Sequence, residues 1–411
     1  MTRKEDVCDW QEYDPQSIFD RGSDLKEEYL GPRVIDLTDP FARTRVIELF
    51  QKGEERNMTF VDTARSSTTT HIGQLFPREM MEAKKSGSVR ALVAQKCQEL
   101  GINLNIQGLV VEFPYTNTAQ KYAPKEIHYA ARTDRNRGLF SPEMQAQIRD
   151  FPVAFAGLSV GSSGLMTWVT EGGMDVHGLD SDTIETANLN RIGLPANYVG
   201  RTKAFAALSE CRVLDPYGNY NISPEAVTKE NVEAFLSRRK VVVEETDSVP
   251  TKDLIRYWAQ KLGIDVVSVA DTGLGHVVVD VEPYRSDPEN AKPYHGLLER
   301  NGWTQAQWEA MPNPVKIAAI IGIQNVPYKM LVAFEKLLHG EIQSFPQPRS
   351  TVALAGSTIS HVLKRLAWGE PVPNRTIISL DEKLDTHFVE EEEMKKELAN
   401  ELATLLHLPL E

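Results

Sequence analysis

The chain has 411 residues, of which 41% are hydrophobic and 25% are charged, and its formal net charge is −13 at pH 7. The length predicts two or three domains, and the composition is typical of a globular protein with a sizeable core. The acidity argues against a nucleic-acid partner that is held through phosphate contacts. No apolar run approaches the roughly 18 residues of a membrane span, so no membrane partner is expected.

The three cysteines, Cys8, Cys97 and Cys211, include no CxxC pair. Their spacing predicts neither a disulfide framework nor a thiolate zinc site, so no structural zinc is expected. So few cysteines are typical of a reducing compartment. The N-terminal residues MTRKEDVCDW are too polar for a signal peptide. Together these features predict a cytoplasmic protein.

The first part of the chain has a mixed pattern and predicts an accessory domain at residues 1–135. Residues 1–50 are polar and punctuated by proline and glycine, which indicates an irregular arm. Residues 77–100 predict one or two helices that end at Gly101, and residues 108–115 predict a short strand. We expect an N-terminal α+β domain that selects the substrate.

The following part of the chain alternates short apolar runs with helical patterns. This alternation predicts βαβ units in a domain at residues 136–375, with a Rossmann-like, mainly parallel sheet and helices on both faces. An acidic amphipathic helix at 386–406 predicts a separate C-terminal tail, residues 376–411. The strands are predicted at 151–160, 174–180, 240–247, 264–273 and 276–284, and the helices at 163–173, 199–215, 251–263, 327–339 and 351–367.

A glycine-rich turn directly follows the first strand of this domain. Its small residues are Gly157, Ser159, Gly161 and Gly164. Such residues let backbone N–H groups at a helix N-terminus approach phosphate oxygens. Asp180 ends the next strand, 23 residues after Gly157, about where an acidic residue binds ribose in dinucleotide-binding folds. Taken alone, the motif fits an NAD(P)-dependent oxidoreductase or a tight structural turn as well as an ATP site.

A set of charged and amide side chains follows the second strand and is more specific. It consists of Asp180, Asp182, Asn188, Arg191 and Lys203. Arginine and lysine neutralise phosphate oxygens and stabilise the charge of an adenylyl-transfer transition state, whereas NAD leaves two cations unexplained. For any single member a solvated polar loop is the simpler interpretation, but the ordered set favours ATP.

Two further candidates lie at the carboxyl ends of later strands, where ligands of open α/β sheets bind. Asp247, in the segment Glu244-Glu-Thr-Asp247, is suited to hold Mg²⁺ between phosphates. The alternative is helix N-capping by Asp247 or Ser248. His276 is a candidate base, although a single histidine is more often structural.

These residues carry a resemblance to a known family. LDSDTIETANLNR followed by VGRTK, and the strand that ends at Asp247, resemble the signature of the ThiF/MoeB superfamily, which also contains the ubiquitin-activating enzymes. The helix near 352–370 and the Arg135-Asn-Arg137 segment resemble further family elements. The resemblance implies ATP and Mg²⁺ as cofactors and a homodimer in which Arg137 reaches the partner's ATP.

The resemblance also implies a role for each matching residue. Asp180 and Asp182 belong with the glycine turn to the nucleotide-binding set, and Asp180 meets the ribose. Asn188, Arg191 and Lys203 contact the phosphates and promote attack on the α-phosphate by a carboxylate, and Asp247 binds Mg²⁺.

Three departures from the family pattern narrow the chemistry. Ser159 and Val160 interrupt the glycine loop, the zinc-binding CxxC pairs are absent, and no cysteine follows Cys211 to accept the acyl group. The resemblance therefore implies direct attack on an acyl-adenylate, which gives an amide, cyclised or dehydrated product. The substrate is a carboxylate, for example a precursor peptide in natural-product maturation. The alternatives are an NAD(P)-dependent oxidoreductase and a non-catalytic binding protein with this fold.

Overall fold

The computed structural model describes residues 32–384, 386 and 388–409, and it divides into two compact units, Met1–His128 and Tyr129–Glu411. The division falls within α6 (Lys125–Arg132) rather than after residue 135 as predicted. Tyr129 explains the difference, because its hydroxyl donates to the carbonyl of Gly172 at 3.1 Å and so ties the end of α6 to the second unit.

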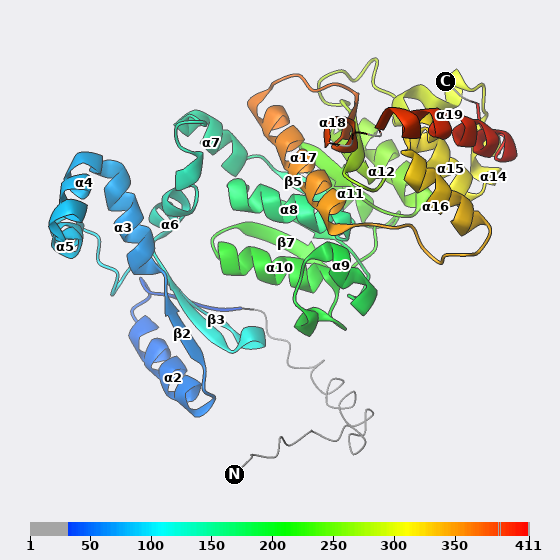
Figure 1. Cartoon of the computed structure of the whole chain (residues 1–411). Helices are drawn as coiled ribbons and strands as arrows, with labels where there is room; N and C mark the ends of the chain where they lie inside the picture. The colour runs from blue at the N-terminus through cyan, green and yellow to red at the C-terminus, as the bar shows by residue number, and fades with distance from the viewer. Residues whose placement is uncertain (1–31, 385, 387, 410–411) are drawn as a thin grey trace, which may run out of the picture. The chain divides into compact units, whose positions relative to one another are not determined.

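The first unit is a four-stranded sheet with helices, drawn in blue and cyan in Figure 1. The strand order is β1-β3-β4-β2, in which β1 and β4 are antiparallel to β3 and β2 is parallel to β4. This confirms the predicted α+β domain. Its elements are β1 (Arg33–Asp36), α2 (Ala42–Glu55), β2 (Thr59–Asp62), α3 (Ala64–Leu75), α4 (Pro77–Ser86), α5 (Val89–Glu99), β3 (Leu109–Phe113) and β4 (Thr118–Tyr122).

Within this unit the prediction of an irregular arm over residues 1–50 is wrong for the part that the structure describes. Residues 33–36 are strand β1 and α2 begins at Ala42, because Ile35, Ala42 and Leu49 bury their side chains in one core with Val110 of β3. The rest of the predicted arm, residues 1–31, lies outside the described residues.

The second unit is built on a seven-stranded sheet in the order β11-β10-β9-β8-β5-β6-β7. The five strands from β9 to β7 in this order are parallel, while β10 is antiparallel to both β9 and β11. This confirms the predicted Rossmann-like, mainly parallel sheet. The strands are β5 (Val153–Ala156), β6 (Asp175–Leu179), β7 (Asn219–Ser223), β8 (Val241–Glu244), β9 (Asp265–Asp271), β10 (His276–Glu282) and β11 (Arg375–Ser379).

Helices cover both faces of this sheet, and β5 shows why. Alternate side chains of a strand point to opposite faces, so Phe155 packs against α8, α10 and α17, whereas Ala154 packs with α11 and α12. Each face therefore buries its own apolar core. The helices are α7 (Pro142–Arg149), α8 (Val160–Glu171), α9 (Leu189–Ile192), α10 (Lys203–Leu214), α11 (Val232–Leu236), α12 (Val249–Leu262) and α17 (Arg349–Trp368).

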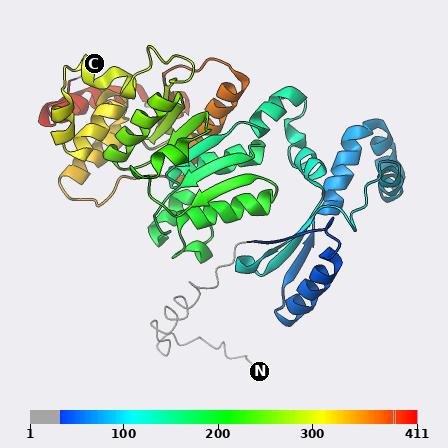
Figure 2. The ribbon, with the colours of Figure 1, turned by 180° about the vertical axis from the view of Figure 1, so that it is seen from behind.

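The segment between β10 and α17 adds a helical layer that the sequence patterns predicted only in part. Figure 2 shows these helices, in yellow and gold, gathered with the red α19 at one end of the second unit. Within the described chain, no helix is long and apolar enough to cross a bilayer. The added helices are α13 (Leu297–Arg300), α14 (Gln305–Ala310), α15 (Asn313–Ile321) and α16 (Tyr328–Leu338), followed after the sheet by α18 (Asp381–Leu384) and α19 (Phe388–Leu405).

The C-terminal region, predicted as a separate tail from residue 376, belongs to the second unit. Strand β11 pairs with β10 along the sheet edge, and α19 buries Leu402 in one core with Leu331 and Phe334 of α16. An amphipathic helix gains most of its stability from such packing, which its own sequence does not reveal.

Candidate functional site

A cavity of about 550 Å³ lies at the carboxyl ends of β5, β8 and β9, the edge at which open α/β sheets bind ligands. One half of its lining is polar and the other half is apolar. The polar half brings together six of the side chains singled out in the sequence. They are Ser159, Asp182, Asn188, Arg191, Lys203 and Asp247.

The glycines of the turn shape this edge without lining the cavity. Gly157 has a φ of +90°, and a Cβ there would lie 2.5 Å from the backbone carbonyl oxygen of Glu245, so β8 approaches the turn closely only because position 157 is glycine. A Cβ at Gly161 would lie 3.4 Å from the Glu245 side chain. Gly164 instead faces Ile359 of α17, and a Cβ at position 164 would lie 2.8 Å from that side chain. Gly164 therefore allows α8 and α17 to pack closely.

Asp180 fastens the glycine turn to the end of β6. One carboxylate oxygen accepts from the backbone N–H of Leu158 at 2.6 Å, and the other accepts from that of Asp182 at 2.8 Å. Burial raises the pKa of Asp180, although both hydrogen bonds oppose this. The side chain does not line the cavity, and the predicted ribose contact remains a prediction.

The two predicted cations reach the cavity from neighbouring elements. Lys203 is the first residue of α10, and its side chain is largely buried. Its Nζ lies 2.7 Å from the carboxylate of Asp182. Arg191 lies in the short helix α9 and donates to the hydroxyl of Ser159 at 3.4 Å. Asn188 accepts from the backbone N–H of Glu185 at 3.0 Å and shapes the turn before α9. Two positive charges therefore stand at one end of the cavity.

Asp247 lines the cavity just beyond β8 and is exposed. The sequence offered Asp247 or Ser248 as the N-cap of α12. The structure has Ser248 in this role, and its hydroxyl accepts from the N–H of Thr251 at 3.4 Å. One carboxylate suits Mg²⁺, which keeps several waters and takes its other ligands from phosphates. Among the described residues, no group of three or more histidine, cysteine or acidic side chains is arranged to hold a metal ion.

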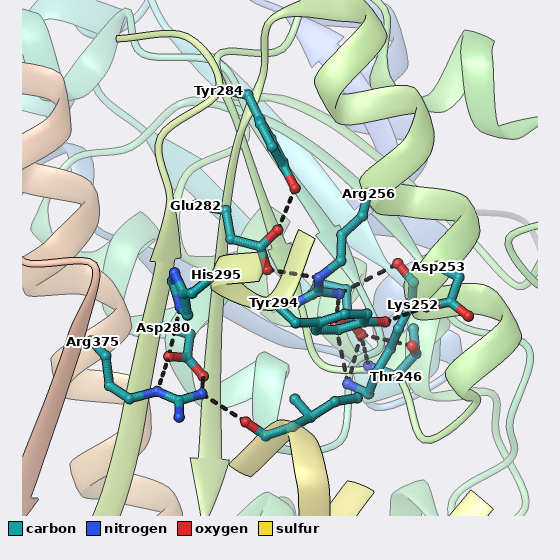
Figure 3. Close-up of polar contacts among 12 residues, drawn as sticks. Thr246, Lys252, Asp253, Arg256, Asp280, Glu282, Tyr284, Tyr294, His295 and Arg375 are labelled. Carbon is teal, nitrogen blue, oxygen red and sulfur yellow. Dashed lines mark hydrogen bonds and ion pairs between the residues drawn. The ribbon is translucent and has the colours of Figure 1, made fainter. Parts of the chain in front are cut away.

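A buried network of charged side chains, two of which line the cavity, was not anticipated from the sequence. Glu244 is fully buried and binds Lys252 and Arg256, each at 2.9 Å. Arg256 also binds Glu282 at 2.7 Å, and the hydroxyl of Tyr284 donates to Glu282 (Figure 3). Burial would raise the pKa of Glu244, but the two cations outweigh it and lower the pKa to about 2.

Only part of this network can be detected in the sequence. Lys252 and Arg256 are four residues apart on α12 and share one face of the helix, which is a detectable signal. Glu282, however, lies on β10, and no local pattern relates it to either cation.

Burial raises the pKa of two acidic side chains in the cavity, Glu245 and Asp271. Burial raises the pKa of Glu245 to about 8, and its Oε1 accepts from the N–H of Val269 at 2.7 Å. Burial also raises the pKa of Asp271, to about 6, against a hydrogen bond from Gly273 and the charge of Arg191. The Oδ2 of Asp271 is buried and accepts no hydrogen bond within the described structure.

The remaining two candidates do not line the cavity. His276 is buried, its Nδ1 lies 2.6 Å from the hydroxyl of Thr272, and burial lowers its pKa to about 4, so it is neutral near pH 7. Arg137 is exposed between α6 and α7. Asp271 therefore lines the cavity, whereas the candidate base His276 does not.

A parallel α/β sheet with glycines, cations and carboxylates at its carboxyl edge defines a nucleotide-binding protein of the Rossmann-like class. The model of the ThiF family matches residues 133–395, and the chain belongs to this family. This confirms the resemblance to the ThiF/MoeB-type adenylating superfamily that the signature residues carry.

Two curated relatives match part of the chain. A protein of Mycobacterium tuberculosis (strain CDC 1551 / Oshkosh), named uncharacterized protein MT1398, is 30% identical over 266 residues, which are 62% of this chain and 36% of that protein. Adenylyltransferase and sulfurtransferase uba4 of Pyricularia oryzae is 33% identical over 102 residues, 25% of this chain and 18% of that protein. The chain thus matches little more than a third of the length of the first relative and less than a fifth of the second.

Solved structures with a similar fold include PaaA, with a TM-score of 0.44 and 14% identity over 62% of this chain and 77% of that chain. E. coli MccB with ATP has a TM-score of 0.44 and 13% identity, covering 62% and 67%. The E. coli tRNA N6-threonylcarbamoyladenosine dehydratase TcdA has a TM-score of 0.41 and 15% identity, covering 58% and 95%. These likenesses concern the fold alone.

Proposed function

We propose that this protein uses ATP to adenylate a carboxylate and then transfers the acyl group directly to a nucleophile. The observation that carries the proposal is that Arg191, Lys203 and Asp247 line one cavity at the carboxyl edge of the sheet. Two cations and one exposed carboxylate suit a triphosphate with Mg²⁺, and family membership supports the same chemistry. NAD leaves both cations unexplained.

In the first step a carboxylate oxygen of the substrate attacks the α-phosphorus of ATP, and the bond to the β-phosphate oxygen breaks to release pyrophosphate. Arg191 and Lys203 stabilise the negative charge on the phosphate oxygens in this transition state, which typically contributes about 10²–10³ in rate per donor. Lys203 leaves Asp182, its partner at 2.7 Å, to do so. Asp247 would hold Mg²⁺, which would supply positive charge beside the departing pyrophosphate.

In the second step a nucleophile attacks the acyl carbon and AMP leaves. Asp271 accepts the proton of an amine-type nucleophile, because its Oδ2 is unpaired and its pKa, near 6, leaves most of it ionised at pH 7. The buried cysteine Cys211 has no part in transfer, since burial raises the pKa of its thiol and its side chain lies on the core-facing side of α10. An amide, cyclised or dehydrated product follows, as in the maturation of peptide natural products.

The test is ATP–pyrophosphate exchange with pooled carboxylates, in the wild-type protein and in Lys203→Ala and Asp247→Ala. We expect exchange in the wild type and a loss of at least about a hundredfold in each variant. Exchange that is unchanged in both variants would refute the site assignment. A thermal stabilisation by NAD and none by ATP with Mg²⁺ would favour the oxidoreductase alternative, and ATP binding without exchange would favour a binding protein.

We further propose a homodimer in which Arg137 acts on the partner's ATP. Arg137 is exposed and outside the cavity of its own chain, as a residue that acts in trans must be. Mixing Arg137→Ala with Asp247→Ala protein should restore about a quarter of the exchange activity per site if subunits exchange freely. No recovery in a mixture shown to contain heterodimers would refute the role in trans.

A further inference from the structure

The cavity continues from its polar half into an apolar half that the proposed chemistry leaves unassigned. Its wall is formed by α15, α16 and the segment that leads to α17. The apolar side chains include Ile317, Ile320, Met330, Phe334 and Phe345. Both halves belong to one continuous cavity, so a molecule with its carboxylate among the cations can extend into the apolar half.

The apolar wall is fixed to the sheet by a salt bridge at its base. Arg375 of β11 donates to both carboxylate oxygens of Asp280, at 2.6 and 2.9 Å, and also to the carbonyl of Ile320 at 2.6 Å. His295 lies 3.0 Å from the same carboxylate (Figure 3). The charge of Asp280, which lines the cavity, is thus compensated, and the last turn of α15 is held in place.

The other helix of the wall is supported from behind. Leu331 and Phe334 of α16 pack against Leu402 of α19, so the helix cannot close into the cavity without losing this core. At the outer end Phe345 stacks on Phe334, with ring centroids 5.7 Å apart, and remains 40% exposed. The apolar half is therefore a supported chamber.

We propose that this chamber holds the hydrocarbon chain of the substrate, which is an aliphatic monocarboxylic acid with an uncharged tail. The inference rests on the proposed adenylation, because that reaction places the carboxylate end beside Arg191 and Lys203. Burial of each methylene tightens binding about threefold to fourfold, so a chain of several carbons supplies most of the affinity.

The wall fits an alkyl chain better than a peptide main chain. Each peptide unit carries an N–H and a C=O that lose binding energy when they are buried without partners. Within the described chain, the side chains that residues 313–347 contribute to the cavity are apolar except for Gln347. The backbone of α15 and α16 is committed to its own helical hydrogen bonds. A peptide would therefore bury unpaired polar groups there, and an alkyl chain has none.

The first test measures binding by calorimetry, without nucleotide, for octanoate, decanoate and dodecanoate and for the dicarboxylate of each length. We expect affinity to rise about tenfold for each added pair of methylenes, and each dicarboxylate to bind at least tenfold more weakly than its monocarboxylate. Affinity that does not depend on chain length, or equal binding of mono- and dicarboxylates, would overturn the proposal.

A matched pair of variants locates the chain. Phe345 and Leu338 are 40% and 39% exposed, but only Phe345 lines the cavity. We expect Phe345→Ser to weaken decanoate binding about threefold to tenfold and Leu338→Ser to change it less than twofold, with both proteins keeping their melting temperature. Equal effects of the two substitutions would place the chain elsewhere.

Pyrophosphate exchange with the same acids separates this inference from the proposed function. Chain-length-dependent binding without any exchange would support the chamber and refute adenylation of these acids. Exchange with short polar or peptidic carboxylates, at rates that do not rise with alkyl chain length, would support adenylation and refute the chamber.

Discussion

Removal of the Lys203 ammonium should weaken the binding of ATP without unfolding the protein. Lys203 is paired with Asp182 at 2.7 Å, but the Asp182 side chain is 64% exposed, so the pair contributes about 0–1 kcal/mol to folding. A charged hydrogen bond to a phosphate contributes about 1.5–3 kcal/mol. Lys203→Ala should therefore weaken ATP binding about tenfold to a hundredfold.

The assay is titration calorimetry with a non-hydrolysable ATP analogue and Mg²⁺, with adenosine as the matched ligand. Adenosine has no phosphates, so its affinity should change less than about twofold. Lys252→Ala is the matched variant, because Lys252 also lines the cavity but binds both oxygens of the buried Glu244, at 2.9 and 3.1 Å. It should lower the melting temperature more and the ATP affinity less than Lys203→Ala does.

Two results would refute this reasoning. Unchanged ATP affinity in a folded Lys203→Ala protein would show that the ammonium stays with Asp182 and does not meet the phosphates. An equal loss of ATP and adenosine affinity would show that Lys203 supports the shape of the cavity, since only the nucleoside moiety is common to both ligands.

Four further predictions concern other parts of the second unit. Asp271 has a pKa near 6, so the rate of acyl transfer should fall as the pH falls through 6. In single-turnover measurements, Asp271→Asn should abolish this acidic limb of the pH–rate profile. A limb that persists in the variant would exclude Asp271 as the base. Arg256→Met should lower the free energy of unfolding by about 3–5 kcal/mol in urea titrations, because it removes a cation shared by two buried carboxylates and leaves Glu282 with only the Tyr284 hydroxyl. A loss below about 1 kcal/mol would contradict this. The pKa of Glu244 is lowered to about 2, so its contribution to stability is present above pH 4.5 and is lost as the pH falls toward 2, a loss that Arg256→Met should reduce. Gly164→Ala should lower the free energy of unfolding by about 1 kcal/mol net. The steric strain of a Cβ 2.8 Å from Ile359 exceeds the stabilisation that alanine's higher helix propensity provides. A stabilised variant would show that α8 and α17 separate easily.

The sequence by itself determined the central strands of the second unit and the polar half of its cavity. Buried strands such as Val241–Glu244 are short apolar runs, and the glycines and charged residues that follow them obey short, regular spacings. The carboxyl ends of parallel strands meet at one edge, so Ser159, Lys203 and Asp247 come together there without further information.

Edge strands were not evident from the sequence, because they depend on pairing. Strand β7 (Asn219–Ser223) buries only Tyr220 and Ile222, too few for a clear pattern in five residues. Strand β11 (Arg375–Ser379) is partly exposed along its length and is defined by its pairing with β10.

Only the tertiary structure decided the assignments that depend on contacts between distant residues. Gly164 belongs by spacing to the glycine turn, yet it serves the contact with Ile359 of α17. The bridge from Asp280 to Arg375 joins residues 95 positions apart, and it fixes the apolar wall of the cavity. Local periodicity reports which face of an element is apolar but not what that face meets. The apolar chamber therefore became visible only when α15 and α16 were placed over the sheet.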